Sequence, residues 1–143
     1  MTTKIGFSDA ERAAMKARAD ELRAEGKKGA KKADGLQALL DKIAEMSETD
    51  RAIAERVHVT ITSAAPELIP RTWYGMPAYS TPEDKMLVAF KNSGKFGMRY
   101  STLEFQDPAK LDDGDLWPVS FAITRWTPAV EKTITELVKA AVS

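Results

Sequence analysis

The sequence contains no cysteine and a single histidine, His58. The absence of cysteine excludes thiol catalysis, zinc–thiolate sites and iron–sulfur clusters, and it agrees with a reducing compartment. One histidine excludes a metal site built from several histidines and disfavours a Ser-His-Asp triad. The sequence also lacks the G-x-S-x-G, Walker A and G-x-G-x-x-G motifs. We therefore interpret His58 as a helix residue without a special role and expect a protein that is not an enzyme.

Long apolar runs and a strong net charge are missing as well. No run approaches the roughly 20 apolar residues that a membrane span needs, and the first residues lack a signal-peptide core. The 21 basic and 21 acidic residues balance. Residues 1–35 carry nine basic against six acidic residues, an asymmetry too mild to predict nucleic-acid binding by the rest of the chain. We expect a cytoplasmic protein with no membrane partner.

Most of the aromatic residues lie within residues 71–100. Residues 86–90 and 96–100 are each predicted to form a half-buried strand, because large apolar side chains fall at every second position: Met86, Val88 and Phe90, then Phe96, Met98 and Tyr100. The tripeptide at 92–94, Asn-Ser-Gly, predicts a tight antiparallel hairpin between them. Gly75, near the start of the block, indicates a bulge or the close approach of another group. This block is predicted to form most of a sheet.

Helical patterns flank the block on both sides. Ser8 with Glu11 predicts a capping box at the start of a first helix, and apolar spacing predicts two more helices, at 36–46 and at about 50–65. After a short helical turn near Asp107 and a further strand at 117–124, Thr127-Pro128 begins the last helix. The order indicates an α+β fold: a mostly antiparallel sheet of four to five strands, helices packed on one face, and a C-terminal helix closing the core.

The segment GKKGAKKADG, residues 26–35, is predicted to be a linker. In a helix, Lys27 would repel Lys31 and Lys28 would repel Lys32. The chain is thereby divided into a Lys-rich, helical N-terminal extension with its linker, residues 1–35, and an α+β domain, residues 36–143. The lysines are candidates for binding DNA or RNA, but no aromatic residue is interleaved to stack on bases, which makes nucleic acid the least favoured partner.

Three motifs carry a family resemblance: WYGMPAY at 73–79, KFGMRY at 95–100 and WPVSFAI at 117–123, the last followed by a capped helix. Together they resemble the YdhG-like family, a domain of unknown function, from about Leu36 to Ser143. The resemblance implies an α+β fold. Because some members are described as frataxin-like iron chaperones, it also implies a small non-enzymatic binding protein with weak iron binding.

Two sets of candidate ligand-binding residues follow. Hard cations such as iron accept carboxylate oxygens, and a glycine-containing loop holds three aspartates, although a solvated turn explains them more simply: Asp112, Asp113 and Asp115. The second set could line an aromatic cleft for a small organic ligand, with packing in the sheet as the simpler interpretation. Its members are Trp73, Tyr74, Met76, Tyr79, Arg99, Tyr100 and Trp117. No cofactor is certain, and iron and a small molecule are the candidate ligands.

Overall fold

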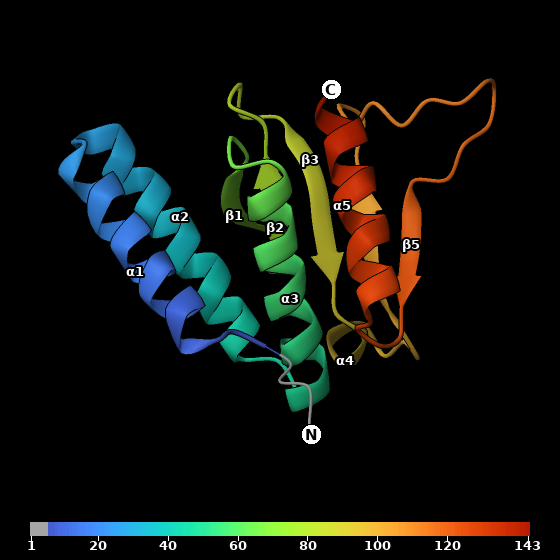
Figure 1. Ribbon diagram of the computed structural model, residues 1–143, viewed down its shortest axis with the longest axis horizontal. Coiled ribbons are helices and arrows are strands. Elements are labelled where there is room, and N and C mark those ends of the chain that lie inside the picture. Colours follow the sequence, from blue (N-terminus) through green and yellow to red (C-terminus); the bar gives the residue numbers. More distant parts are fainter. Residues whose placement is uncertain (1–5) are drawn as a thin grey trace.

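A computed structural model describes residues 6–143 and has the predicted α+β fold. The elements in chain order are α1 (Asp9–Ala24), α2 (Lys27–Ala44), α3 (Glu48–Ala64), β1 (Ile69–Trp73), β2 (Met76–Ser80), β3 (Met86–Lys91), α4 (Ser93–Phe96), β4 (Ser101–Phe105), β5 (Ser120–Ile123) and α5 (Pro128–Val142). The five strands form one antiparallel sheet in the order β1-β2-β3-β4-β5. Figure 1 shows α3 and α5 in front of this sheet, with α1 and α2 beside its β1 end.

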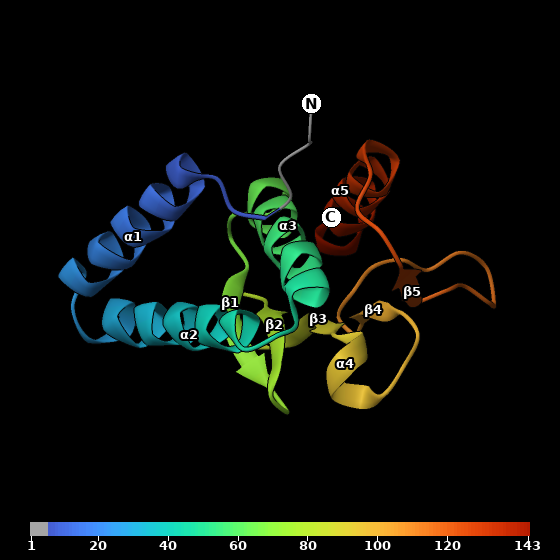
Figure 2. The same ribbon diagram turned by 90° about the horizontal axis from the view of Figure 1, so that it is seen from below.

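The core lies between the sheet and the helices on one of its faces, as the sequence predicts. Alternate strand residues such as Phe90 and Leu103 are fully buried there and pack with Ile61 of α3 and Val138 of α5. Figure 2, seen from below, shows α3 and α5 together on one side of the strands, whereas only the short α4 lies near the opposite side. That opposite face carries a small cluster around Met76 and two alanines.

The predicted starts of the first and last helices are confirmed. The Ser8 side chain accepts from the Glu11 backbone N–H and the Glu11 carboxylate accepts from the Ser8 N–H, which completes the capping box of α1. Ser47 caps α3, and Thr127 caps α5 with a proline in its first turn. Each cap satisfies a backbone donor that the helix itself leaves without a partner.

The prediction of a linker at 26–35 is wrong, because α2 begins at Lys27 and continues through the segment. Repulsion between like charges on a helix costs only a few tenths of a kcal/mol per pair. The burial of Ala33 stabilises the helix by more than the repulsion between the lysines destabilises it. The lysine side chains are exposed to solvent. Gly29 lets α2 approach α1 closely, since a Cβ there would collide with the Leu22 carbonyl. Residues 1–5 of the predicted extension lie outside the described residues.

The tight hairpin predicted at 92–94 is also wrong. The chain leaves β3 at Lys91, forms α4 and re-enters the sheet as β4 only at Ser101, so residues 96–100 are not a strand. The physical reason is Asp50 at the start of α3. Its carboxylate accepts from the Ser93 hydroxyl at 2.7 Å and from the Gly94 backbone N–H at 2.9 Å. These bonds hold the segment in a helical turn rather than a two-residue loop.

Two smaller differences follow the end of β4. The helical turn expected after Asp107 is a simple turn, in which the Ala109 N–H donates to the Gln106 carbonyl. The strand expected at 117–124 is confined to β5, which pairs with β4 through Leu103 opposite Phe121.

In the part of the chain that the structure describes, no helix has the length and apolar character needed to cross a membrane.

Candidate functional site

The residues of the predicted aromatic cleft lie in three separate places. Tyr79 is buried on the helix-covered face, where its hydroxyl lies 2.8 Å from His58 Nδ1. Trp73 and Tyr74 lie at the turn between β1 and β2, with ring centroids 5.0 Å apart, and Trp73 also packs against Met76 on the other face of the sheet. Tyr79 is therefore a packing residue, whereas Trp73 and Tyr74 reach the surface.

The remaining members lie at opposite ends of the sheet. The Arg99 guanidinium stacks 4.9 Å above the Tyr100 ring, just before β4 begins. Ser101 pairs with Ile123 at that end of the sheet, and β5 starts at the other end, where the preceding loop carries Trp117. The structure therefore brings together Trp73, Tyr74 and Met76 but separates them from Tyr79 and Trp117.

The three candidate iron ligands are Asp112, Asp113 and Asp115, all exposed on the loop between β4 and β5. Within residues 6–143, no group of three or more His, Cys, Asp or Glu side chains is arranged to hold a metal ion. A positive φ of 69° at Gly114 turns the chain between the aspartates. Weak iron binding to these exposed carboxylates remains a prediction, and no preformed cage supports it.

His58 takes part in a buried contact rather than a surface site. Its ring stacks on Tyr79 at a centroid distance of 5.7 Å, and Phe7 meets it edge-on at 6.0 Å. Burial lowers the pKa of His58 to about 4, because the charged imidazolium loses its hydration there. The imidazole is thus neutral near pH 7 and serves as a hydrogen-bonding member of the core.

A groove lies between α2 and β1, and most of the charged residues that line it are basic. Its volume is about 500 Å³, and the lining includes Lys28, Lys31 and Lys32 from α2 and Arg71 from β1. Positions 28, 31 and 32 share one face of the helix because they are separated by three and four residues. Within the described chain these three lysines form no ion pair, whereas Arg71 is bound to Asp84 at 2.7 Å. We call this feature the basic groove.

The basic groove is narrow where α2 touches β1. Gly35 lies against the backbone of β1, and a Cβ at this position would be 2.8 Å from the Pro70 carbonyl oxygen. That distance is shorter than real Cβ contacts allow, so only glycine lets the helix sit so close to the strand. Together with Pro70, which has no N–H, the helix covers the outer edge of β1.

A second feature lies where β1 ends. The two-residue turn between β1 and β2 has positive φ at both central residues, 50° at Tyr74 and 74° at Gly75. Tyr74 is 81% exposed. Lys95 of α4 donates to the Tyr74 carbonyl at 3.1 Å and fills the space beside Gly75, so the predicted close approach of another group at this glycine is confirmed.

The ammonium groups of Lys95 and Lys91 also lie over the ring of Phe96, at 5.4 and 4.8 Å. We call Trp73, Tyr74, Phe96, Lys91 and Lys95 the aromatic tip.

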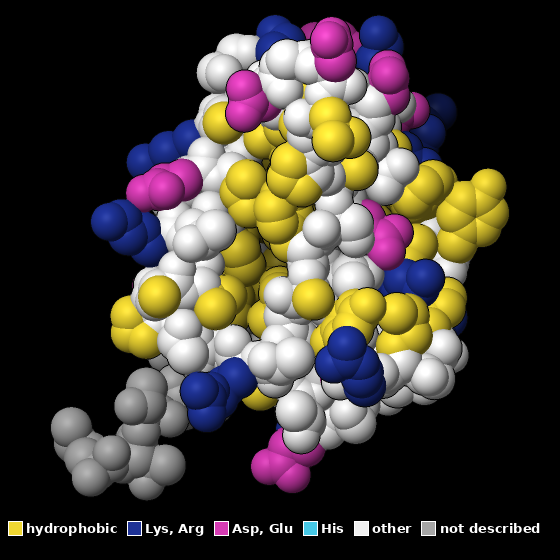
Figure 3. Space-filling model, turned by 90° about the vertical axis from the view of Figure 1, so that its right-hand side faces the viewer, with side chains coloured by type: hydrophobic (Ala, Val, Ile, Leu, Met, Phe, Trp, Pro, Cys, Tyr) yellow, Lys and Arg dark blue, Asp and Glu magenta, His cyan; other side chains and the backbone are white. Residues whose placement is uncertain are grey.

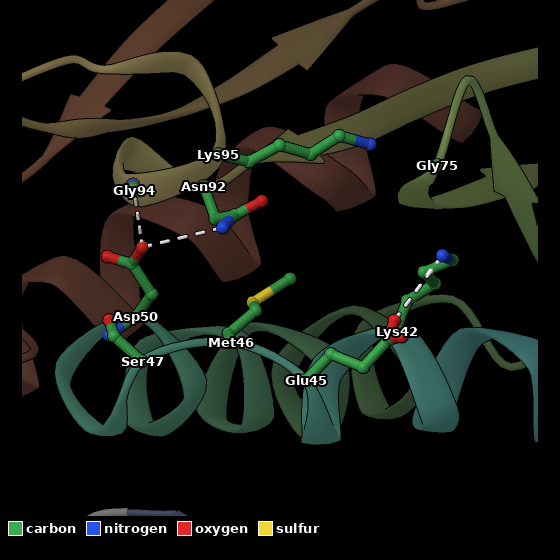
Figure 4. A pocket seen from close by; sticks show the side chains of 9 residues that line it. All are labelled: Lys42, Glu45, Met46, Ser47, Asp50, Gly75, Asn92, Gly94 and Lys95. Carbon is green, nitrogen blue, oxygen red and sulfur yellow. Dashed lines mark hydrogen bonds and ion pairs between the residues drawn. The ribbon is translucent and has the colours of Figure 1, made fainter.

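A pocket of about 390 Å³ lies beside the aromatic tip, at the C-terminal end of α2. Figure 4 shows Lys95 extending toward Gly75, with Met46 projecting into the space below it and Lys42 paired with Glu45. At the far side, the buried Asp50 holds α4 in place through the bonds described above. Because Lys95 belongs to α4, the position of the aromatic tip depends on this carboxylate.

A third surface lies on the side of α5 and β5. Figure 3 shows hydrophobic side chains gathered in a strip down the centre of this side. The partly buried Phe121, Trp126 and Leu137 pack against the core, whereas Leu116 is 90% exposed. Because its partly buried side chains belong to the packing of the core, we interpret this surface as the rim of the core.

Compared with protein-family models, with curated proteins and with solved structures, the chain shows no match. The site must therefore be judged from its own geometry. Sequence reasoning missed the basic groove because it treated the i,i+4 pairs Lys27/Lys31 and Lys28/Lys32 as evidence of repulsion and therefore of a linker. The same spacing is also that of one helix face, which was the available signal.

Proposed function

We propose that this chain is a non-enzymatic binding protein for phosphate-bearing polyanions, which it holds in the basic groove. A binding role agrees with the one that the YdhG-like resemblance implies, and it replaces iron with an anionic ligand. The observation that carries the proposal is a single groove lined by one arginine and by three lysines that form no ion pair within residues 6–143.

The spacing of these charges suits a chain of phosphates. Lys28 and Lys32 are one helical turn apart, about 6 Å along the axis of α2. This separation is below the screening length of roughly 8 Å at physiological ionic strength, so the charges act together on one ligand. The acidic residue lining the groove is Asp84, whose carboxylate is already bound by Arg71. An approaching anion therefore meets a local excess of positive charge, although the whole chain is neutral.

The absence of catalysis in this proposal rests on what faces the groove. A general base or nucleophile needs a titratable group with a perturbed pKa close to the bound substrate. His58, whose pKa burial lowers to about 4, is 3% exposed and packs in the core, away from the groove. The lysines and the strand backbone can hold a ligand, and the carboxylate of the groove, Asp84, is already bound by Arg71.

The geometry supports the other two hypotheses, iron binding and an aromatic cleft for a small organic ligand, less well than it supports the basic groove. No feature of the described residues favours iron at Asp112, Asp113 and Asp115, which are solvated and unconverged. A small organic ligand in a single aromatic cleft would need Tyr79 and Trp117 beside Trp73, and the register of the sheet keeps them apart.

The test uses inorganic polyphosphate as the probe and isothermal titration calorimetry as the measurement. The triple variant Lys28→Gln, Lys31→Gln and Lys32→Gln should bind at least about tenfold more weakly at low salt. The dependence of log K on log salt should also flatten, because fewer counterions are released. A matched variant removes the same charge from exposed positions elsewhere: Lys16→Gln, Lys132→Gln and Lys139→Gln. Equal losses in both variants would reduce the effect to net charge and refute the groove.

A further inference from the structure

The aromatic tip contains a residue whose backbone conformation works against its side chain. Positive φ disfavours bulky residues, and Asn-Gly is the usual pair in a two-residue hairpin turn with positive φ at both positions. Here the pair is Tyr74-Gly75, with φ of 50° at the tyrosine. Burial does not compensate for the strain, because Tyr74 is 81% exposed. A strained and solvated aromatic ring at a turn tip is a sign of a binding contact.

Neighbouring groups hold this ring in a fixed place. Lys95 fastens the turn through its bond to the Tyr74 carbonyl, and the Trp73 ring lies 5.0 Å from the Tyr74 ring. The same Lys95 ammonium lies over Phe96, which is 38% exposed. One ammonium group therefore bridges the Tyr74 backbone and the Phe96 ring, and the Trp73 ring lies against the Tyr74 ring.

The aromatic tip continues the basic groove. Arg71 lines the groove, and Trp73 is two residues further along β1, so both side chains lie on the same face of the strand. At about 3.3 Å per residue, roughly 10 Å separates Arg71 from Tyr74. A ligand held by the lysines of α2 and by Arg71 therefore reaches the rings at the end of β1 without changing direction.

We propose that the polyanion is a single-stranded nucleic acid, with its phosphates in the basic groove and one or two unpaired bases stacked on Tyr74 and Phe96. This inference rests on the proposed function and adds the class of ligand. Proteins that bind single strands without sequence preference combine a cationic groove along the backbone with aromatic side chains that stack on bases. Stacking requires a free base face, which a duplex offers only at its ends. Inorganic polyphosphate has no bases, so it uses the groove alone.

The experiment measures fluorescence anisotropy of a labelled oligothymidylate of about ten nucleotides, a length within the range of single-strand binding sites. The variant is Tyr74→Asn, because asparagine tolerates positive φ and suits the turn while it removes the ring. Its melting temperature should equal or exceed that of the unchanged chain. Oligothymidylate binding should weaken between about fivefold and a hundredfold, the range for loss of one stacked base. Polyphosphate binding should stay within about twofold, since phosphate contacts are untouched. Tyr74→Phe keeps the ring and should retain binding.

Different results separate this inference from the proposed function. If Tyr74→Asn leaves oligothymidylate binding unchanged while the triple lysine variant weakens it, the groove stands and the stacking inference is overturned. Equal affinity for a duplex of the same length would overturn the single-strand assignment in the same way. If neither oligothymidylate nor polyphosphate binds at low salt, both proposals fail. A parallel loss of oligothymidylate and polyphosphate in Tyr74→Asn would also overturn the stacking inference, because the ring would then act through the groove.

Discussion

Replacing Asp50 by alanine should loosen α4 and destabilise the protein by about 3 kcal/mol. Asp50 is 4% exposed, and its carboxylate accepts two short hydrogen bonds, from the Ser93 hydroxyl at 2.7 Å and from the Gly94 N–H at 2.9 Å. A hydrogen bond to a charged group contributes about 1.5–3 kcal/mol, and the partly exposed donors recover some solvation, so we take the lower end for each. A loss of about 3 kcal/mol is measurable for a domain whose total stability is about 5–15 kcal/mol.

Urea denaturation measures this loss as a shift of the midpoint at constant m-value. The matched control is Glu48→Ala, an exposed acidic residue in the same first turn of α3, which should cost only about 0.5 kcal/mol through the helix dipole. A double-mutant cycle with Ser93→Ala should give a coupling energy above about 1 kcal/mol. If Asp50→Ala costs no more than Glu48→Ala, or if the coupling is absent, the carboxylate does not hold α4 and the reasoning is wrong.

Two further predictions concern the core. Because burial lowers the pKa of His58 to about 4, the unfolded state binds a proton below pH 6.5 that the folded state does not, so stability is greatest above pH 6.5 and falls toward pH 4. The free energy of unfolding should fall by about 3 kcal/mol over this range. Denaturation of His58→Gln at the same pH values gives the profile without the histidine, and the difference between the two profiles is the contribution of His58. Identical profiles would contradict the lowered pKa. Phe121 is half-buried and meets Phe105 edge-on at 5.9 Å, so Phe121→Ala should cost about 2–3 kcal/mol, whereas Thr124→Ala, at an exposed position, should cost under about 0.5 kcal/mol. Equal effects in thermal melting would contradict the observed register of β5.

The parts of the fold that sequence reasoning predicted depend on local patterns. The Ser8 capping box and the Thr127 cap involve residues three apart, and the apolar stripe of α5 repeats within the helix. The spacing of apolar residues likewise predicted β3 and β5, whereas the strand predicted at 96–100 is absent and β4 begins only at Ser101. These patterns predict the structure correctly because the interacting residues are close together in the sequence as well as in space.

The errors arose where distant residues decide the local structure. Asp50 lies 43 positions before Ser93, and nothing in either segment alone indicates that a carboxylate will fix the chain after β3. The lysines at 28, 31 and 32 were assigned to a linker because repulsion was weighed without the buried face of α2, whose Ala33 and Leu39 are inaccessible to solvent.

The candidate site was predictable only in part for the same reason. Trp73 and Tyr74 belong to the aromatic block of the sequence, and the structure does leave Tyr74 exposed. Their relation to Lys28, more than forty positions earlier, exists only because α2 packs along β1. The aromatic residues that the lysine segment lacks are supplied by another element, which sequence interleaving does not reveal.

The contact at Gly35 has a consequence for how the protein behaves at high concentration. An uncovered edge strand is a template on which a second chain can add its own strand, and α2 prevents this at β1 by lying against the Pro70 carbonyl. A larger side chain at position 35 would push α2 away from β1. This displacement would widen the basic groove, and it would also expose the edge of β1 to pairing with a second chain. Gly35 therefore links solubility to ligand access: a substitution there that widens the basic groove would also promote self-association.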